Sequence, residues 1–137
     1  MMGEVMDMLW DDPVTKGLVK SLDVAALRQK VVAQNIANLN TPGYKRSYVV
    51  FSEELARARE RLSLRLTDPR HIPGGEISGE PQVKVERSTS RRSDGNNVDL
   101  DQEMLDLVTN QLHYNMLAQK ISERYATWRS IINEGRG

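Results

Sequence analysis

Residues 99–134 read DLDQEMLDLVTNQLHYNMLAQKISERYATWRSIINE, and this stretch decides the fold class. Steps of four and three residues along it reach apolar or aromatic side chains with one glutamine among them: Leu100, Met104, Leu107, Gln111, Tyr114, Ala118, Ile121, Tyr125, Trp128 and Ile132. This spacing is typical of a helix that packs lengthwise against another helix. No proline or glycine interrupts it before Gly135, so a single helix roughly 50 Å long is predicted.

The first third of the chain carries a matching row. It follows Asp12 and Pro13, two residue types that favour the start of a helix, and it also contains one glutamine: Leu18, Leu22, Ala25, Gln29, Val32, Ile36 and Leu39. The helix is predicted to end at Thr41-Pro42-Gly43, because Pro-Gly suits the two central positions of a type II turn.

The two rows predict a mainly α fold in which the long N- and C-terminal helices pair as an antiparallel coiled coil. The alternative is two amphipathic helices packed on a globular middle, but the middle has too few apolar residues to form a core. Gln29 and Gln111 either fix the register of the pair, since a buried amide needs a partner, or are incidental. Residues 1–10 form either a separate turn of helix or a kinked continuation.

The middle segment, residues 44–97, is expected to be irregular or β-like with one short helix. We predict extended pieces at 44–51 and 82–86, a helix at 52–66, and flexible loop elsewhere, including 88–97. Asp99 and Gln102 resemble a capping box at the start of the last helix. Three segments follow: a helical 1–43, this middle segment, and a helical 98–137, with the two termini forming one core.

Composition excludes several classes of function. Of the 137 residues 39% are hydrophobic and 5% aromatic, and 19 Lys and Arg balance 19 Asp and Glu, so no net field attracts nucleic acid. Cysteine is absent, and no run of about 18 apolar residues predicts a membrane span. Glu4 and Asp7 occupy the region where a secretory signal would be basic and apolar, so no cleaved signal peptide is expected.

Candidate sites for chemistry are few. His71 and His113 have no Cys, Asp or Glu at metal-ligand spacing, so both are expected to be structural or on the surface. No phosphate-binding glycine loop and no nucleophile elbow occurs in the sequence. The arginines of 52–66 and Arg91-Arg92 lack interleaved aromatics, so a solvated face or a charged contact in an assembly is expected. We predict no enzyme activity, no cofactor and no metal.

The end of the first helix is the most specific part of the chain, and its residues form a signature turn: Asn35, Asn38, Asn40, Thr41, Pro42, Gly43 and Tyr44. This turn resembles the N-terminal motif of bacterial flagellar rod, hook and hook-associated proteins, where a long helix ends at Asn-x-x-Thr-Pro-Gly-Tyr. Within that family, residues 67–72 (TDPRHI) and 94–104 (DGNNVDLDQEM) resemble the proximal rod subunits. A sister rod subunit, the nearest alternative, usually has a Ser-Arg-Ala-Tyr-x-Ala-Asn-like stretch, from which residues 110–115 (NQLHYN) depart.

The resemblance implies a structural subunit of the proximal rod in the periplasmic part of the flagellar basal body. It implies export by the flagellar type III apparatus without a cleaved signal, and helical assembly through the terminal helices, whose two apolar rows form the assembly seam. The implied partners are copies of the chain, other rod proteins, the membrane ring, the ring–rod adaptor and the export apparatus. A soluble helical adaptor or secretion chaperone is the rival of another class, although it has no need of the signature turn.

Overall fold

The computed structural model describes residues 11–51 and 80–135. Along the chain these residues form helix α2 (Pro13–Ala37), strand β1 (Ser47–Val50), strand β2 (Gln82–Val85) and helix α4 (Leu100–Glu134). The predictions for residues 1–10, for the helix at 52–66 and for His71 fall outside the described residues.

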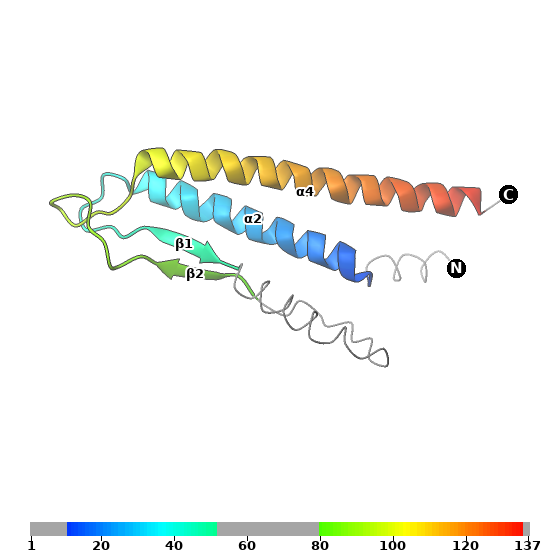
Figure 1. Ribbon diagram of the computed structural model, residues 1–137, viewed down its shortest axis with the longest axis horizontal. Coiled ribbons are helices and arrows are strands. Elements are labelled where there is room, and N and C mark those ends of the chain that lie inside the picture. The colour runs from blue at the N-terminus through cyan, green and yellow to red at the C-terminus, as the bar shows by residue number, and fades with distance from the viewer. Residues whose placement is uncertain (1–10, 52–79, 136–137) are drawn as a thin grey trace, which may run out of the picture.

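The two helices lie side by side and run in opposite directions, as predicted (Figure 1). Hydrogen bonds between them set the register: Asn35 pairs with Glu103, Gln29 with Asn110, and Thr15 with Arg124. The residue numbers of each pair add up to 138 or 139. Neither helix in the described part of the chain is long and apolar enough to cross a membrane.

Helix α2 begins where the sequence predicts. Asp12 has an extended backbone (φ −64°, ψ 123°), and its carboxylate accepts hydrogen bonds from the Thr15 backbone N–H at 3.0 Å and from the Thr15 hydroxyl at 2.9 Å. Pro13 occupies the first turn, where its missing N–H costs nothing. The helix ends at Ala37 with Asn38 as its C-cap, and the signature turn follows directly.

Helix α4 also begins at an aspartate. The Asp99 carboxylate accepts hydrogen bonds from the backbone N–H groups of Asp101 and Gln102. These bonds, led by the one from Gln102, lower the pKa of Asp99 against the opposing effect of burial. The predicted capping box is only half formed, because the Gln102 side chain donates to Asp106 one turn further along at 2.9 Å.

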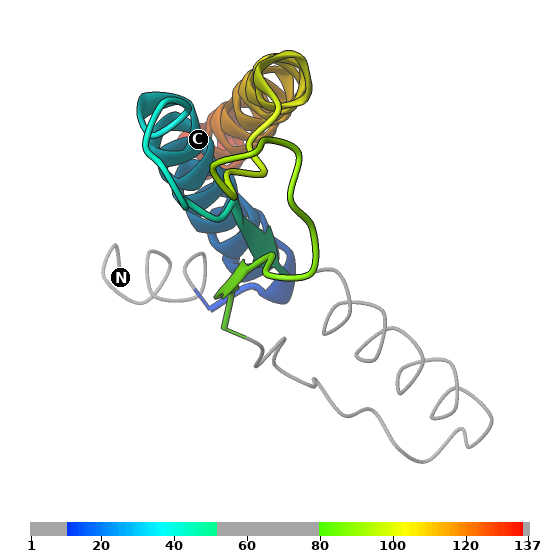
Figure 2. The same cartoon turned by 90° about the vertical axis from the view of Figure 1, so that its left-hand side faces the viewer.

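The strands form a two-stranded antiparallel sheet beside α2, as the end-on view shows (Figure 2). Ser47 lies opposite Val85, and Val50 lies opposite Gln82, so both predicted extended segments are confirmed. β1 is half-buried and contacts α2, whereas β2 is exposed. Helix α2 is therefore the central element, in contact with both α4 and the sheet.

The core of the described residues is small and half polar. Its buried hydrophobic members are Val24, Ala25, Val31, Val32, Phe51 and Val98. An equal number of polar or charged residues is buried: Thr15, Asn35, Asn96, Asn97, Glu103 and Asn110. Hydrogen bonds between distant segments must therefore supply much of the specificity that a larger apolar core would otherwise give.

Candidate functional site

The signature turn is a type II turn, as predicted. The Tyr44 backbone N–H donates to the Thr41 carbonyl at 3.3 Å, and Gly43 has φ +72°, a value that side chains disfavour. The Gly43 N–H also donates to the Asp94 carbonyl at 2.9 Å. Gly95 (φ +85°) packs against Gly43, since a Cβ on Gly95 would lie 3.7 Å from the Gly43 Cα. The turn is thus joined to the segment that leads into α4.

Asn96 holds the signature turn and the segment before α4 together from the interior. It is fully buried, and its amide nitrogen lies 2.9–3.1 Å from the carbonyl oxygens of Asn38, Leu39 and Thr41, just past the end of α2. Its amide oxygen accepts the Val98 backbone N–H at 2.8 Å. One side chain therefore satisfies backbone groups on both sides of the joint.

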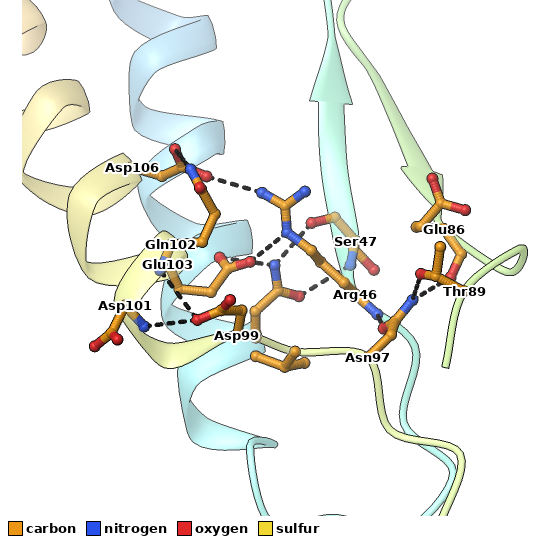
Figure 3. Close-up of polar contacts among 12 residues, drawn as sticks. Arg46, Ser47, Glu86, Thr89, Asn97, Asp99, Asp101, Gln102, Glu103 and Asp106 are labelled. Atoms are coloured by element: carbon orange, nitrogen blue, oxygen red, sulfur yellow. Dashed lines mark hydrogen bonds and ion pairs between the residues drawn. The ribbon is translucent and has the colours of Figure 1, made fainter. Parts of the chain in front are cut away.

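Asn97 connects the same segment to the residues that flank the two strands. Its oxygen accepts the Arg46 backbone N–H at 2.6 Å, and its nitrogen donates to the Glu86 carbonyl at 2.8 Å (Figure 3). Arg91 pairs with Asp99, and Arg92 donates to the Leu39 carbonyl at 3.1 Å. Residues 88–97 form a loop without helix or strand, and these side chains attach it to the end of α2, to the residue before β1 and to the start of α4. The side chains of Arg91 and Arg92 are therefore bonded to residues of the same chain.

Asn35, the signature residue in the last turn of α2, pairs with β1 through its side-chain amide as a neighbouring strand would. Its amide oxygen accepts the Ser47 backbone N–H at 3.0 Å, and its amide nitrogen donates to the Ser47 carbonyl at 2.8 Å. A residue on a neighbouring strand would make the same two bonds. The Tyr44 hydroxyl donates to the same amide oxygen at 3.2 Å. Asn35 therefore fixes the angle at which the chain leaves α2 and enters β1.

A buried carboxylate completes the joint. Glu103 of α4 is fully buried, accepts a hydrogen bond from Asn35 at 3.0 Å, and pairs with the Arg46 guanidinium (Figure 3). Arg46 also donates to Asp106 at 2.8 Å. Partial burial acts to lower the pKa of Arg46, but the bonds and charges of Glu103 and Asp106 outweigh it and raise that pKa. We call Asn35, Arg46, Asn96, Asn97 and Glu103 the polar joint.

Asn110 sets the register further along the pair. Its amide nitrogen donates to the Ala25 carbonyl at 2.8 Å and to the Gln29 side-chain oxygen at 3.0 Å. Gln29 therefore does contact the opposite helix, as the register hypothesis expects. Gln111 does not: it is exposed and donates to Asn115 at 3.2 Å on its own helix.

At the far end of the pair, Arg124 donates to the Thr15 hydroxyl at 3.0 Å and pairs with Asp12. Burial acts to raise the pKa of Asp12, but its bonds from Thr15 and Arg124 prevail and lower it. These two contacts of Arg124, one with a hydroxyl and one with a carboxylate, connect the beginning of α2 to the last third of α4.

The predicted seam residues divide into two groups. All members of the α2 row are buried or half-buried within the chain. Of the α4 row, five are half-buried: Leu107, Ala118, Ile121, Trp128 and Ile132. The others are exposed: Leu100, Met104, Gln111, Tyr114 and Tyr125. The side of α4 that faces α2 instead carries the polar residues Glu103 and Asn110, although the periodicity predicted that the apolar row would face α2 there.

A second apolar stripe occupies the side of α4 that faces away from α2. Since a helix turns by about 100° per residue, Leu112 points roughly opposite to Asn110. The stripe consists of Leu105, Val108, Leu112 and Met116, whose exposed fractions are 55–64%. No Asp, Glu, Lys or Arg occurs between Asp106 and Lys120. An exposed helical face without charge is typical of the core of a protein–protein interface.

The described residues offer no evident chemistry. Across residues 11–51 and 80–135 no group of three or more His, Asp or Glu side chains could hold a metal ion. His113 is exposed on α4. What the arrangement provides is a rigid angle between three segments and an apolar surface beside it.

Sequence reasoning missed most of the polar joint. Glu103 lies outside the predicted apolar row, and Asn96 and Asn97 belong to the predicted loop. Two signals existed in the family resemblance: Asn35 is part of the signature turn, and residues 94–104 contain Asn96, Asn97 and Glu103.

Comparison with known proteins agrees with this architecture. Residues 22–45, which hold the end of α2 and the signature turn, match the model of a family described as flagella basal body rod protein. The chain is 32% identical to the flagellar basal body rod protein FlgB of Bacillus subtilis, over 88% of this chain and 94% of that protein. It is 42% identical to FlgB of Borrelia hermsii (81% and 89% covered) and 31% identical to FlgB of Escherichia coli (85% and 90% covered).

The class is therefore that of structural subunits of the flagellar basal body rod, as the resemblance predicted. Within it, the chain belongs to the FlgB family.

Proposed function

We propose that the chain is a non-catalytic building block of the proximal rod that assembles helically through its terminal helices. Its partners in this proposal are copies of itself, other rod proteins, the membrane ring and the ring–rod adaptor. The flagellar type III apparatus exports it to the periplasm without a cleaved signal. The absence of cysteine suits this route, because an unfolded chain without thiols forms no disulfides in an oxidising compartment.

The observation that supports assembly best is the apolar stripe on α4. Four large apolar side chains on a helix face without charges would stay in water if the chain remained alone. Burying them against another subunit removes this cost, at roughly 25 cal/mol for each Å² of apolar surface. A contact between different faces of successive copies generates a helical polymer, as a rod requires.

The polar joint supports a second part of the proposal. A subunit repeated along a rod needs the same angle between its helices and its middle segment in every copy. Asn35 and Glu103 supply that angle through hydrogen bonds to backbone and side-chain atoms of fixed direction. The joint also leaves the stripe free, because its bonds lie on the opposite side of α4.

Leu112→Glu tests the proposal. The variant should fold, because Leu112 does not face α2, yet a buried charge in the subunit contact should prevent assembly. Leu112→Met, which keeps an apolar side chain, is the matched control. In cells that lack the native chain, we expect both variants to be exported, Leu112→Met to restore rods and swimming, and Leu112→Glu to restore neither.

Normal rods in the Leu112→Glu cells would contradict assembly through the stripe. Circular dichroism of the purified variants checks that the helices are intact. A compact dimer whose sedimentation does not change with concentration would instead favour a soluble adaptor.

A further inference from the structure

A cleft of about 290 Å³ lies beside α2, between β1 and α4. Helix α2 is the middle element of the three, with α4 on one side and the sheet on the other (Figure 1). Val31 and Val32 of α2 and Val49 of β1 form the apolar part of the lining, and Thr109 and His113 of α4 belong to it as well. Pockets for small-molecule ligands usually hold about 300–1,000 Å³, so a few protruding side chains of another protein suit this cleft better.

The cleft also contains a positive charge without a partner. Two arginines line it, and Arg46 is already paired with Glu103 and Asp106. Arg28 is half-buried and forms no hydrogen bond or ion pair within residues 11–51 and 80–135. Because a charge that loses water without gaining a partner is costly, Arg28 favours an occupant that brings a carboxylate into the cleft.

A carboxylate stands next to the apolar stripe of α4. Asp101 is exposed, precedes Leu105 by about one helical turn and points to the same side of the helix. Its side chain forms no hydrogen bond or ion pair within the part of the chain that the structure describes. Arg28 precedes Val32 by the same four residues on α2, so the charge and the apolar side chain are about 6 Å apart along both helices. The two surfaces therefore match in spacing and are opposite in charge.

We propose that the cleft receives the apolar stripe of a second copy of the chain. Leu105 of the second copy packs on Val32, and Asp101 of the second copy pairs with Arg28. The α4 helix of the second copy then runs in the same direction as α2, because only this direction aligns both pairs. The proposal rests on the proposed function, in which the stripe makes the contact between copies, and it identifies the surface that the stripe contacts.

The cleft and the stripe are different surfaces of one chain. Since consecutive helix residues differ by about 100°, Leu112 of the stripe points well away from His113 of the cleft. Each copy can therefore offer its stripe to one neighbour and its cleft to another, and such a contact continues into a polymer. Two stripes packed on each other would leave Arg28 and Asp101 without partners, so charge complementarity favours the contact between stripe and cleft.

Charge exchange tests the proposal in cells that lack the native chain. Arg28→Asp and Asp101→Arg each place two like charges in the contact, and we expect each single variant to lose rods and swimming. The double variant Arg28→Asp/Asp101→Arg restores the ion pair with its charges exchanged and should restore both. Lys30→Asp changes an exposed charge of α2 outside the cleft, so these cells should swim normally.

Circular dichroism of the purified variants checks the fold, which Arg28→Asp should leave intact because Arg28 has no bond to lose within the described residues. Asp101→Arg also removes an acidic residue from the first turn of α4, where a negative charge is favoured. The double variant keeps that change, so its recovery would come from the restored pair. A double variant as defective as the single variants would overturn the proposal.

Normal rods in the Arg28→Asp cells would also overturn it. If Leu112→Glu still prevented assembly in that case, the stripe would contact another surface and the proposed function would stand. Normal rods with both variants would contradict the proposed function itself.

Disulfide trapping gives an independent measurement, because the chain has no cysteine of its own. In cells that make Val49→Cys and Leu105→Cys chains together, we expect disulfides that join the two variants, identified on non-reducing gels and by mass spectrometry. Disulfides formed mainly between two Leu105→Cys chains would show that stripes pack on each other, and would overturn the proposal.

Discussion

Removal of the Glu103 carboxylate should destabilise the chain more than any other single loss of charge in the described residues. Glu103 is fully buried and joins three segments through Asn35 and Arg46. Breaking a buried ion pair by removing one partner costs about 3–5 kcal/mol, because the other charge stays buried without compensation. Arg46 keeps Asp106 and is partly exposed, so we expect about 3 kcal/mol for Glu103→Ala, at the lower end of that range.

Urea unfolding followed by circular dichroism measures this loss. With a slope of about 2 kcal/mol per M, the midpoint should fall by roughly 1.5 M while the slope stays constant. Glu123→Ala, which removes an exposed partner of Lys120 from the same helix, is the control and should change little. The double variant Glu103→Met/Arg46→Met should recover most of the loss, because no fully buried charge is left without a partner, and Asp106 is partly exposed and still bonded to Gln102. Equal losses for Glu103→Ala and Glu123→Ala would refute this reasoning.

Three further predictions concern the ends of the helices. The pKa of Asp12 is below its usual 3.8 in the folded chain, so the stability that its carboxylate contributes is complete above pH 3.8 and is lost as the pH falls through the lowered pKa. In urea unfolding, the loss of free energy of unfolding caused by Asp12→Asn should therefore be smaller at about pH 3 than at about pH 7. Gly43→Val should lower the free energy of unfolding by about 1–3 kcal/mol because of its positive φ, whereas Gly135→Ala, in a right-handed conformation, should change thermal unfolding little. Asn96→Leu should cost about 1–3 kcal/mol, because the buried Val98 N–H loses its acceptor and three carbonyls beyond α2 each lose one hydrogen bond, against almost nothing for exposed Asn115→Leu in the same unfolding assay.

The sequence predicted the elements whose signals are local. Apolar spacing located both helices, Asp12 and Asp99 marked their beginnings, and the Pro-Gly pair identified the turn. Each of these features depends on residues within one or two turns of chain. The antiparallel pairing followed because the two rows are of similar character and need a common partner.

The polar joint could not be predicted in this way. Burial of Glu103 depends on Arg46, which lies 57 residues away, and burial of Asn110 depends on Ala25, 85 residues away. Periodicity treats such polar residues as exposed, so it assigned the inner side of α4 to Met104 and Gln111. The composition of residues 88–97 suggested a flexible loop for the same reason, since the partners of Asn96 and Asn97 belong to other segments.

The antiparallel register also dictates an order of folding. Partners across the pair are 68 residues apart at Asn35 and Glu103, 81 apart at Gln29 and Asn110, and 109 apart at Thr15 and Arg124. Closing the largest loop first would cost the most chain entropy, whereas each contact made after the one at the joint adds only a short length of chain. We therefore expect the helices to pair first at the polar joint and then progressively toward Thr15 and Arg124. Amide hydrogens near Glu103 should exchange most slowly, and those near Arg124 should open first.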